Sequence, residues 1–370
     1  MNIQKATQSY ERWLSKYLNL IPADLAKKHD DMAAATFPYF RATFYRWMQL
    51  WGEHAAGGDG RGQRKRKAAW TRAPEVLAVG DLHVENFGTW RDVEGRLVWG
   101  VNDFDEVYPL PFTIDLIRLA SSAHLAVEGA HLSIPHRDAC DAILAGYGEG
   151  INSGGKAIVL AELHDWLRHM VTGELRDPVL FWRKMDALPT LRKAIPKSAR
   201  QALERVMPER ELQYRIATRQ AGLGSLGRER YVALAEYHGG KIAREAKALA
   251  PSACSWAGGG KAVKRIRYGE VLATAVRCRD PFVHQQGRWI VRRLAPDCSR
   301  VELRSMPKVR DEARLLYSMG FETANIHLGT KGAAKGIKPA LRKLPHFWLH
   351  EAAEIMLSAT MKDWKAWKKG

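Results

Sequence analysis

The spacing of apolar residues along the chain indicates helices near both ends and through the middle. The first helix is indicated by five apolar residues at helical intervals, Tyr10, Trp13, Leu14, Tyr17 and Leu18. Residues 1–55 are expected to be helical as a whole, with an aromatic-rich second segment at Phe37–Trp51. Later helices are expected at Thr113–Val127, in the stretch that continues to about residue 207, and at Arg265–Cys278, Arg310–His327 and Trp348–Trp367.

Shorter apolar runs that end at glycine or at turn residues indicate strands. The first run, Val76–Val79, stops at Gly80. A hairpin is predicted after it, with strands at Phe87–Arg91 and Leu97–Val101. Three further strands are expected at Tyr231–Leu234, Lys241–Ala248 and Arg288–Leu294. Helices and strands of this kind together predict an α+β fold with a mostly helical larger part.

Polar residues gather where these first strands end. Asp81, His83 and Asn86 follow the Val76–Val79 strand within a few positions. The return strand of the hairpin leads directly to Asp103 and Asp105. Because both groups follow apolar strands at one end of the hairpin, we expect them to form a site and not a solvated loop.

The spacing of these residues favours phosphoryl transfer. Protein kinases carry a catalytic Asp, an Asn five positions later that binds metal, and further on an Asp-Phe dipeptide. Asp81, Asn86 and Asp103-Phe104 have this arrangement. Asp81 is therefore predicted to be the catalytic base, with Asn86 and Asp103 as Mg²⁺ ligands and Asp105 as a further candidate ligand. His83 is predicted to act in the catalytic loop by shaping it through a hydrogen bond.

A glycine-rich segment later in the chain is predicted to cover nucleotide phosphates. Gly222, Gly224 and Gly227, with Ser225 among them, form a G-x-G-x-x-G between two strand-like runs. A dinucleotide-binding unit requires a helix directly after the last glycine, whereas here a strand follows. Strand, glycine-rich turn and strand instead match the phosphate-covering hairpin of kinases.

A lysine and a glutamate complete the predicted nucleotide site. Lys247 lies on the strand after the glycine-rich hairpin, and Glu270 lies on the helix predicted to follow. Kinases use such a lysine to orient phosphates and to pair with a helix glutamate. We predict the same roles for Lys247 and Glu270.

These parts follow one another in kinase order only if the chain is read as a circle. The catalytic loop at Asp81 precedes the glycine-rich segment instead of following it. We therefore predict a two-lobed, circularly permuted protein-kinase-like fold, in which Lys247 faces Asp103 across the cleft. Residues 1–207 and 306–370 would build the large lobe, and residues 208–305 the small nucleotide-binding lobe.

Composition limits the kinds of protein and of binding partner that fit this sequence. The 370 residues contain no apolar run of membrane-spanning length, and the N-terminus lacks the apolar core of a signal peptide. Cys140, Cys254, Cys278 and Cys298 are scattered, which favours a reducing, cytoplasmic compartment over a disulfide framework. The formal charge of +18 favours anionic partners such as nucleotides or nucleic acid.

Several segments resemble known families. The Asp-x-His order at Asp81 resembles aminoglycoside phosphotransferases, and Asp115-Leu116 resembles the buried pair that braces their catalytic loop. The segments G-D-L-H-V-E-N-F-G, N-D-F-D-E and A-G-L-G-S-L-G resemble the bacterial family DUF2252. This resemblance covers roughly residues 37–330, and it implies a distant relative of protein kinases that uses ATP and Mg²⁺ to modify a hydroxyl group of a small molecule or protein.

Three other functions remain open at this point. Adenylyl transfer would use the same metal ligands with the nucleotide bound in the opposite orientation. An inactive nucleotide-binding protein or a basic nucleic-acid-binding protein would use the net charge and the basic segment 57–67. A metallohydrolase is less favoured, because His83 is the one histidine near the acidic residues.

Overall fold

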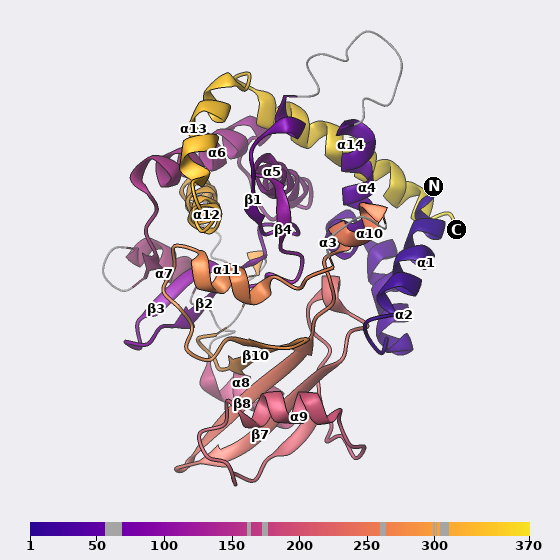
Figure 1. The fold of residues 1–370 in the computed structure, drawn as a ribbon, viewed down its shortest axis with the longest axis vertical. Coiled ribbons are helices and arrows are strands. Elements are labelled where there is room, and N and C mark those ends of the chain that lie inside the picture. Colours follow the sequence, from indigo (N-terminus) through magenta and orange to yellow (C-terminus); the bar gives the residue numbers. More distant parts are fainter. Residues whose placement is uncertain are drawn as a thin grey trace.

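The protein has a large, mostly helical part and a smaller part built on one antiparallel sheet (Figure 1). The structure is a computed structural model, and it describes residues 1–55, 69–160, 164–171, 177–259, 264–298, 300, 302–303 and 311–370. The chain is α+β, as predicted.

Helices make up both ends of the chain and most of the larger part. Those before the first strand are α1 (Ile3–Leu14), α2 (Pro22–Ala34), α3 (Thr36–Ala42), α4 (Phe44–Ala55) and the 3₁₀ turn η1 (Trp70–Arg72). Those that follow are α5 (Thr113–Glu128), α6 (His136–Ser153), α7 (Asp165–Val171), α8 (Pro178–Asp186), α9 (Lys197–Glu204), η3 (Leu223–Ser225), α10 (Ala253–Ala257), α11 (Tyr268–Thr274), α12 (Glu312–His327), α13 (Ala333–Lys343) and α14 (Trp348–Trp367). The aromatic-rich segment predicted as one helix is two, because Thr43 leaves the helical conformation with φ −121° and ψ 35°.

Two small sheets carry the segments predicted to form the site. Strands β1 (Glu75–Ala78) and β4 (Tyr108–Pro111) pair in antiparallel fashion. Strands β2 (Phe87–Arg91) and β3 (Leu97–Val101) form the predicted hairpin with the predicted bounds, and β5 (Ile158–Val159) adds to its edge.

The five-stranded sheet forms the centre of the smaller part. Its strands are β6 (Arg215–Thr218), β7 (Arg230–Tyr237), β8 (Gly240–Ala248), β9 (His284–Gln286) and β10 (Trp289–Leu294), in the order β6-β7-β8-β10-β9. Lys247 of β8 stands between Arg230 of β7 and Ile290 of β10. The glycine-rich segment joins β6 to β7, so the predicted strand, glycine-rich turn and strand are present.

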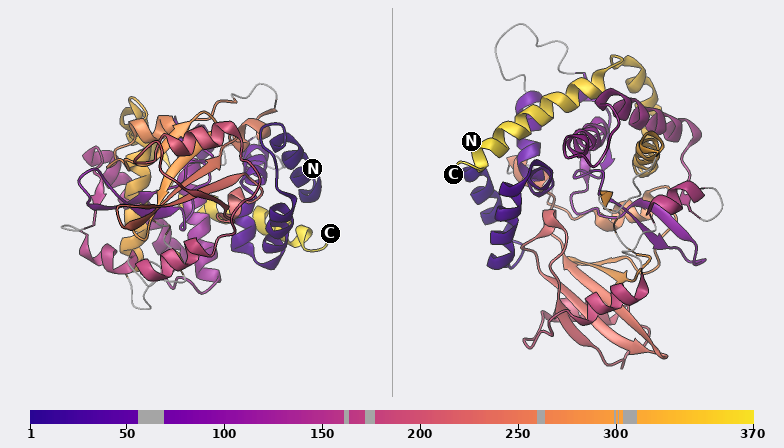
Figure 2. Two further views of the ribbon diagram at one scale, coloured as in Figure 1. Left: turned by 90° about the horizontal axis from the view of Figure 1, so that it is seen from below. Right: turned by 180° about the vertical axis from the view of Figure 1, so that it is seen from behind.

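Distant parts of the chain pack together in the helical part. Helix α12 lies against α6, and α14 crosses α4 and α5. The two chain ends lie side by side (Figure 2), and Gln4 Nε2 donates a hydrogen bond of 2.9 Å to the carbonyl oxygen of Ala366. The end of the chain is thus part of the same core as its beginning.

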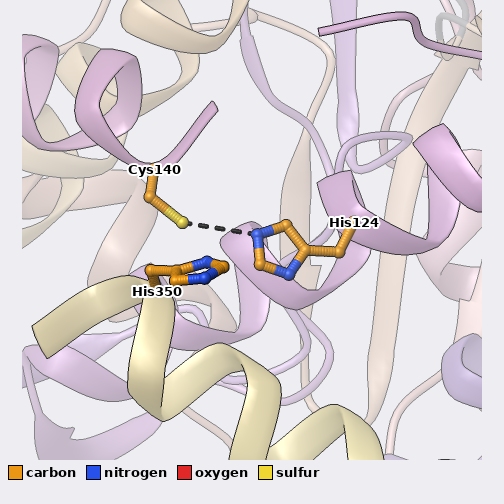
Figure 3. Close-up of side chains that lie close together, drawn as sticks. All are labelled: His124, Cys140 and His350. Atoms are coloured by element: carbon orange, nitrogen blue, oxygen red, sulfur yellow. Dashed lines mark hydrogen bonds between the residues drawn. The ribbon is translucent and has the colours of Figure 1, made fainter. Parts of the chain in front are cut away.

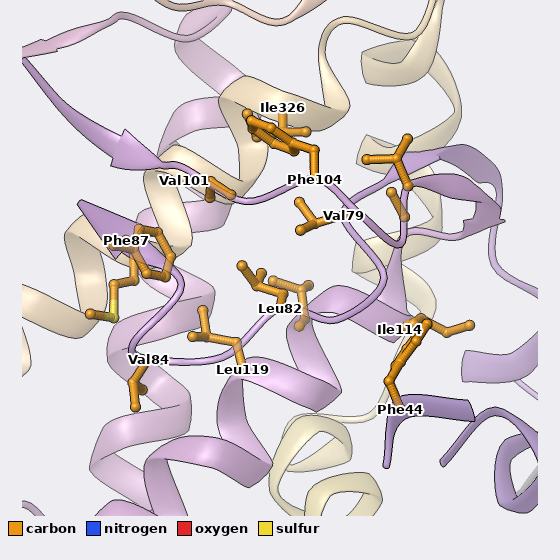
Figure 4. Packing of buried hydrophobic residues seen from close by; sticks show 14 of the residues in the cluster. Phe44, Val79, Leu82, Val84, Phe87, Val101, Phe104, Ile114, Leu119 and Ile326 are labelled. Atoms are coloured by element: carbon orange, nitrogen blue, oxygen red, sulfur yellow. The ribbon is translucent and has the colours of Figure 1, made fainter. Parts of the chain in front are cut away.

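Apolar side chains pack directly beneath the predicted catalytic loop. Val79 and Leu82 of the loop region and Phe104 are buried with Leu119 of α5 and Ile326 of α12 (Figure 4). The core therefore fixes the backbone from which Asp81 and Asp103 project.

Some predicted elements differ from the observed ones. The helix expected at Arg265–Cys278 is the shorter α11, because Ala275 is already extended with φ −61° and ψ 149°. Helix α12 begins at Glu312, and the predicted start at Arg310, the predicted boundary at residues 305–306 and the basic segment 57–67 lie outside the described residues. No helix among the residues that the structure describes has both the length and the apolar character that a membrane crossing requires.

Candidate active site

Two loops meet between the helical part and the five-stranded sheet, and both carry predicted site residues. One loop joins β1 to β2 and contains Asp81 and Asn86, and the other follows β3 and contains Asp103. Asn86 links them, because its Nδ2 donates to the carbonyl oxygens of Asp81 (3.1 Å) and Asp103 (3.3 Å). Asn102 N also donates to the Asn86 carbonyl oxygen at 3.1 Å. The structure thus brings together the Asp81 and Asp103 segments that the sequence pairs.

Asp115 holds the start of the first loop from below. Its two carboxylate oxygens accept hydrogen bonds from the backbone N–H groups of Val79 (2.7 Å) and Gly80 (2.8 Å). His327 of α12 lies 2.9 Å from the same carboxylate, and its other ring nitrogen lies 2.7 Å from the Tyr147 hydroxyl. Gly80 has φ +81°, and a Cβ there would lie 2.5 Å from the carbonyl oxygen of Glu106, so only glycine fits this turn. The brace predicted for Asp115 is present.

Asp81 is held on one side by a buried arginine. Arg118 Nε donates to Asp81 Oδ1 at 2.9 Å, and its Nη2 contacts the same oxygen. The Arg118 guanidinium stacks over Phe40, with 4.1 Å between its central carbon and the ring centroid. Burial raises the pKa of the Asp81 carboxyl, and the charge of Arg118 opposes that rise. Arg118 therefore fixes Asp81 Oδ1 and leaves the other oxygen for a different partner.

His83 has the environment of a neutral imidazole. Burial, together with the charges of Arg41 and Arg118, lowers the pKa of His83 well below its usual value. Its Nδ1 accepts a hydrogen bond of 3.2 Å from the backbone N–H of Glu85. This bond shapes the turn between Asp81 and Asn86, in line with the loop-shaping role predicted for His83.

Lys247 reaches the site from the five-stranded sheet. Its Nζ lies 3.1 Å from Asp103 Oδ1 and 2.7 Å from Asp105 Oδ1. The lysine side chain is fully buried, whereas that of Asp103 is 38% exposed. The predicted contact between Lys247 and Asp103 is therefore present.

The two carboxylates beside Lys247 differ in their acidity. Burial alone would raise the pKa of Asp103, but the charges of Lys247 and Arg292 lower it below its usual range. Burial and the neighbouring Asp103 charge raise the pKa of Asp105. Asp103, the more exposed of the two, thus carries the negative charge more readily.

The glycine-rich turn covers Asp81. A Cβ built on Gly224 would lie 3.4 Å from Asp81 Oδ2 and 3.2 Å from the carbonyl oxygen of Arg41. Gly222 has φ +75°, and Ser225 Oγ accepts a hydrogen bond of 3.0 Å from Arg230. Gly227 is fixed by a hydrogen bond of 2.9 Å from the Ile21 N–H to its carbonyl oxygen. The turn therefore closes over the open side of the Asp81 carboxylate.

Glu270 has a different partner from the one predicted. It lies on α11, and its carboxylate pairs with Arg267 at 2.9 Å. Lys247 is instead balanced by the two aspartates that follow β3. The predicted Lys247–Glu270 pair is therefore wrong for this structure, in which Glu270 pairs with Arg267, three positions before it.

The family comparison covers the part of the chain that contains the Asp81 loop. Residues 20–211, just over half of the 370, match a family described as an uncharacterized protein conserved in bacteria. The chain belongs to the DUF2252 family. The DUF2252 match includes Asp81, Asn86, Asp103 and Asp115 and ends before the glycine-rich turn. No curated protein and no solved structure matches the chain.

Several residues that shape the site of this DUF2252 chain were not singled out from the sequence. Arg228 joins the glycine-rich turn to the second loop, because its guanidinium pairs with Asp105 (3.3 Å) and Glu106 (3.1 Å). Arg118 was also missed. The sequence feature that could have indicated Arg118 is its position three residues after Asp115, because this spacing places both side chains on one part of the α5 surface. Arg228 carries no comparable local signal.

A cavity of about 450 Å³ opens beside the loop that follows β3 in the DUF2252 fold. It is bounded by the hairpin, by α11 and by β10, and its lining includes Asn102, Phe104, Tyr268, Arg277 and Arg292. This volume lies within the range of about 300–1,000 Å³ usual for small-molecule pockets. Asp81, Asp103 and Lys247 are not among the residues that line this cavity, so it neighbours the predicted site through Asn102 and Phe104.

Proposed function

We propose that this protein is an ATP- and Mg²⁺-dependent phosphotransferase with a circularly permuted, kinase-like arrangement. The observation that carries the proposal is the ion pair between Lys247 and Asp103, which are 144 positions apart in the chain. A lysine from a small sheet and an aspartate after a hairpin are the groups that bind phosphates and metal in kinase-like enzymes. The acceptor in this proposal is a hydroxyl group.

The residues present fit a magnesium–nucleotide complex. Asn86 and Asp103 offer oxygen ligands, which Mg²⁺ prefers. Both side-chain hydrogen bonds of Asn86 use Nδ2, so neither occupies its carbonyl oxygen Oδ1. Asn86 and Asp103 would hold the cation, while Lys247 and the Gly222–Gly227 turn would contact phosphate groups. ATP, when bound, supplies the phosphoryl group that is transferred.

Asp81 has the position of the general base in this proposal. With Oδ1 held by Arg118, the proton of an acceptor hydroxyl would pass to Oδ2, which faces the glycine-rich turn. Burial raises the pKa of Asp81, and a carboxylate with a raised pKa is a stronger base. Arg118 acts as a positioning residue because it orients the carboxylate without contacting the acceptor.

The proposal is tested by the dependence of thermal stability on ATP, ADP, GTP and AMP, each with and without Mg²⁺. A nucleotide at about 100 times its Kd is expected to stabilise the native state by about 2.7 kcal/mol. Asp103→Asn and Lys247→Met are expected to lose most of this Mg²⁺-dependent stabilisation. Lys241→Met is the matched control, since Lys241 lies on the same strand but is exposed and pairs with Asp186. The absence of any Mg²⁺-dependent shift in the parent protein would overturn the proposal.

Product mass then separates phosphoryl from adenylyl transfer. An acceptor that gains a phosphate supports the proposed reaction, whereas a gain of AMP supports adenylyl transfer by the same residues. A protein that instead binds nucleic acid would show an affinity that falls steeply with salt and no response to Mg²⁺ and nucleotide.

A further inference from the structure

A group of histidine, cysteine and glutamate side chains gathers in the helical part. Helix α5 contributes His124, α6 contributes His136 and Cys140, and α14 contributes His350 and Glu354. On α6 and on α14 the two residues are four positions apart, so each pair projects from the same side of its helix. The group therefore comes from three helices whose residues are far apart in sequence.

Three of these side chains converge closely. His124, Cys140 and His350 each offer one ligand atom, and these atoms lie within 4.8 Å of one another. Figure 3 shows the three side chains pointing toward a common centre. The distance from Cys140 Sγ to His124 Nε2 is 3.4 Å. Two ligands bound tetrahedrally to zinc, with Zn–S of about 2.3 Å and Zn–N of about 2.0 Å, lie roughly 3.5 Å apart.

One ring nitrogen in this group lacks an ordinary partner. The buried Nδ1 atom of His350 has no hydrogen-bond partner among the residues described. His124 Nε2, the ring nitrogen that faces Cys140, lies 3.3 Å from the carbonyl oxygen of His136. Buried polar atoms are nearly always paired, so the His350 imidazole, which converges with His124 and Cys140, requires an explanation. A bound cation with nitrogen and sulfur ligands supplies one.

Glu354 lies where an orienting carboxylate is needed. Its Oε1 is 3.0 Å from His124 Nδ1, the ring nitrogen on the side away from Cys140. Histidines that bind metal through one nitrogen commonly donate the other N–H to a carboxylate, which fixes the tautomer and the ring orientation. Glu354 is 47% exposed and His136 29%, so solvent reaches this side of the group.

We propose that His124, Cys140 and His350 form a zinc site that joins α14 to α5 and α6, with Glu354 orienting His124. Thiolate and imidazole ligands select Zn²⁺ over Mg²⁺, so this site and the oxygen ligands at Asp103 take different metals. On binding, the Cys140 thiol releases its proton to solvent and a sulfur–zinc bond forms. Water fills the fourth position of the tetrahedron. The site does not depend on the function proposed for the Asp81 loop.

The test measures metal content and the spectrum of bound cobalt. The full-length protein is stripped with a chelator, loaded with Zn²⁺ or Co²⁺, and desalted. About one zinc per chain is expected in the parent, and the Co²⁺ form is expected to show thiolate-to-metal charge transfer and tetrahedral bands. Cys140→Ser is expected to lose the charge-transfer band. His350→Gln is expected to bind zinc roughly 100-fold or more weakly, because losing a ligand exceeds the 10–100-fold cost of losing an outer partner.

Matched controls separate this site from adventitious binding. Cys254→Ser removes another buried thiol, and His346→Gln removes an exposed imidazole just before α14. Both are expected to keep the zinc content and the cobalt spectrum of the parent. Zinc content that is equal in the parent, Cys140→Ser and His350→Gln would mean an adventitious ion only and would overturn the proposal. If the two site variants fail to fold, the cobalt spectrum of the parent decides, and a spectrum without thiolate bands rejects the site.

Discussion

At the scale of single residues, the Asp81 carboxylate is fixed on one side and covered on the other. Arg118 binds Oδ1 from the buried side, and the Gly224 backbone lies next to Oδ2. A reactant that approaches Oδ2 must therefore enter between the glycine-rich turn and the loop. The glycine-rich turn and the Asp81 carboxylate therefore border the same small space, although they are far apart in the sequence.

Replacing Asp81 by Asn is expected to reduce turnover roughly 100-fold or more, because it removes a positioned base. Binding of the Mg²⁺–nucleotide complex should remain close to that of the parent. The free energy of unfolding should also fall by about 2 kcal/mol, since the buried Arg118 loses its charged partner. Steady-state kinetics and urea unfolding measure the two effects.

Asp92→Asn is the control for this change. Asp92 is also buried and paired with an arginine, at 2.7 Å from Arg96, but it lies in the turn of the hairpin. It should lose stability without losing turnover. Equal turnover in Asp81→Asn and the parent would remove Asp81 from the mechanism.

At the scale of elements, α6 and α12 approach each other through glycines. A Cβ on Gly146 would lie 1.9 Å from the carbonyl oxygen of Tyr317, and one on Gly320 would lie 2.1 Å from that of Ile143. No L-side chain fits at either contact. This close approach brings His327, at the end of α12, to Asp115 below the Asp81 loop.

Gly146→Ala is expected to lower the free energy of unfolding by about 2 kcal/mol, because the added methyl group forces the two helices apart. Gly148→Ala on the same helix is the matched control, since a Cβ there meets nothing within 4 Å. That change should raise stability by up to about 1 kcal/mol through helix propensity. Urea unfolding of both variants tests the contact, and equal stabilities would contradict it.

The contact between α12 and β3 is expected to depend on pH. Glu322 of α12 is buried and accepts hydrogen bonds from Val101 N (3.2 Å) and Asn325 Nδ2 (2.8 Å). Burial raises its pKa to about 7, against the opposing charge of Arg277. A raised carboxyl pKa gives stability that is complete below its unfolded pKa of about 4.3 and is lost as pH rises through the folded value.

The free energy of unfolding of the parent should therefore fall by about 3 kcal/mol relative to Glu322→Gln between about pH 4.5 and pH 7. Urea unfolding at several pH values measures this difference. Glu351→Gln, at an exposed position on α14, serves as the control and should follow the parent. A parent and Glu322→Gln with parallel pH profiles would contradict the assignment.

At the scale of the whole molecule, the two ends of the chain meet while the glycine-rich turn and the Asp81 loop lie far apart in sequence. Gln4 and Ala366 are hydrogen-bonded, so a short linker can join the termini. Residues 208–211 between α9 and β6 are exposed and form a turn. Exposed turns tolerate re-cutting of the chain.

A protein re-cut between Glu209 and Arg210, with its original ends joined, is expected to fold and to keep the Mg²⁺–nucleotide response of the parent. Its order would then place the glycine-rich sheet before the Asp81 loop. A chain re-cut between Asp103 and Phe104 is the control and should lose the response, because the cut separates Asp103 from the buried ring that follows it. Thermal shift with ATP and Mg²⁺ measures both. Loss of folding in the first protein would contradict the view that residues 208–211 are a dispensable connection.

The sequence predicted the parts whose signals are local. The hairpin at Phe87–Arg91 and Leu97–Val101 was predicted from two short runs on either side of a turn at Asp92–Gly95, and the structure contains both strands with these bounds. Lys247 could be placed because its strand follows a glycine-rich hairpin. The partner of Glu270 was predicted wrongly, although Arg267, three positions before it, was a local candidate.

Contacts between distant helices also escaped prediction. The side chains of His124, Cys140 and His350 converge because of the way α5, α6 and α14 pack against one another. Residue spacing in the sequence does not indicate how helices will pack. Arg228 was missed for the same reason, since its partners Asp105 and Glu106 are more than 120 positions away. The places of these side chains in the fold are set by contacts between segments that are far apart in the sequence.

The bond between His327 and Asp115 has a consequence for biosynthesis. The two residues are 212 positions apart, so Asp115 leaves the ribosome long before its partner is translated. At rates of roughly 5–20 residues per second this interval lasts about 10–40 s. During that time a nascent chain contains the Asp81 loop but lacks the imidazole beneath it. The Asp81 loop is therefore expected to gain this support only after His327 has been translated, which keeps a shorter nascent chain from presenting the loop in its final order.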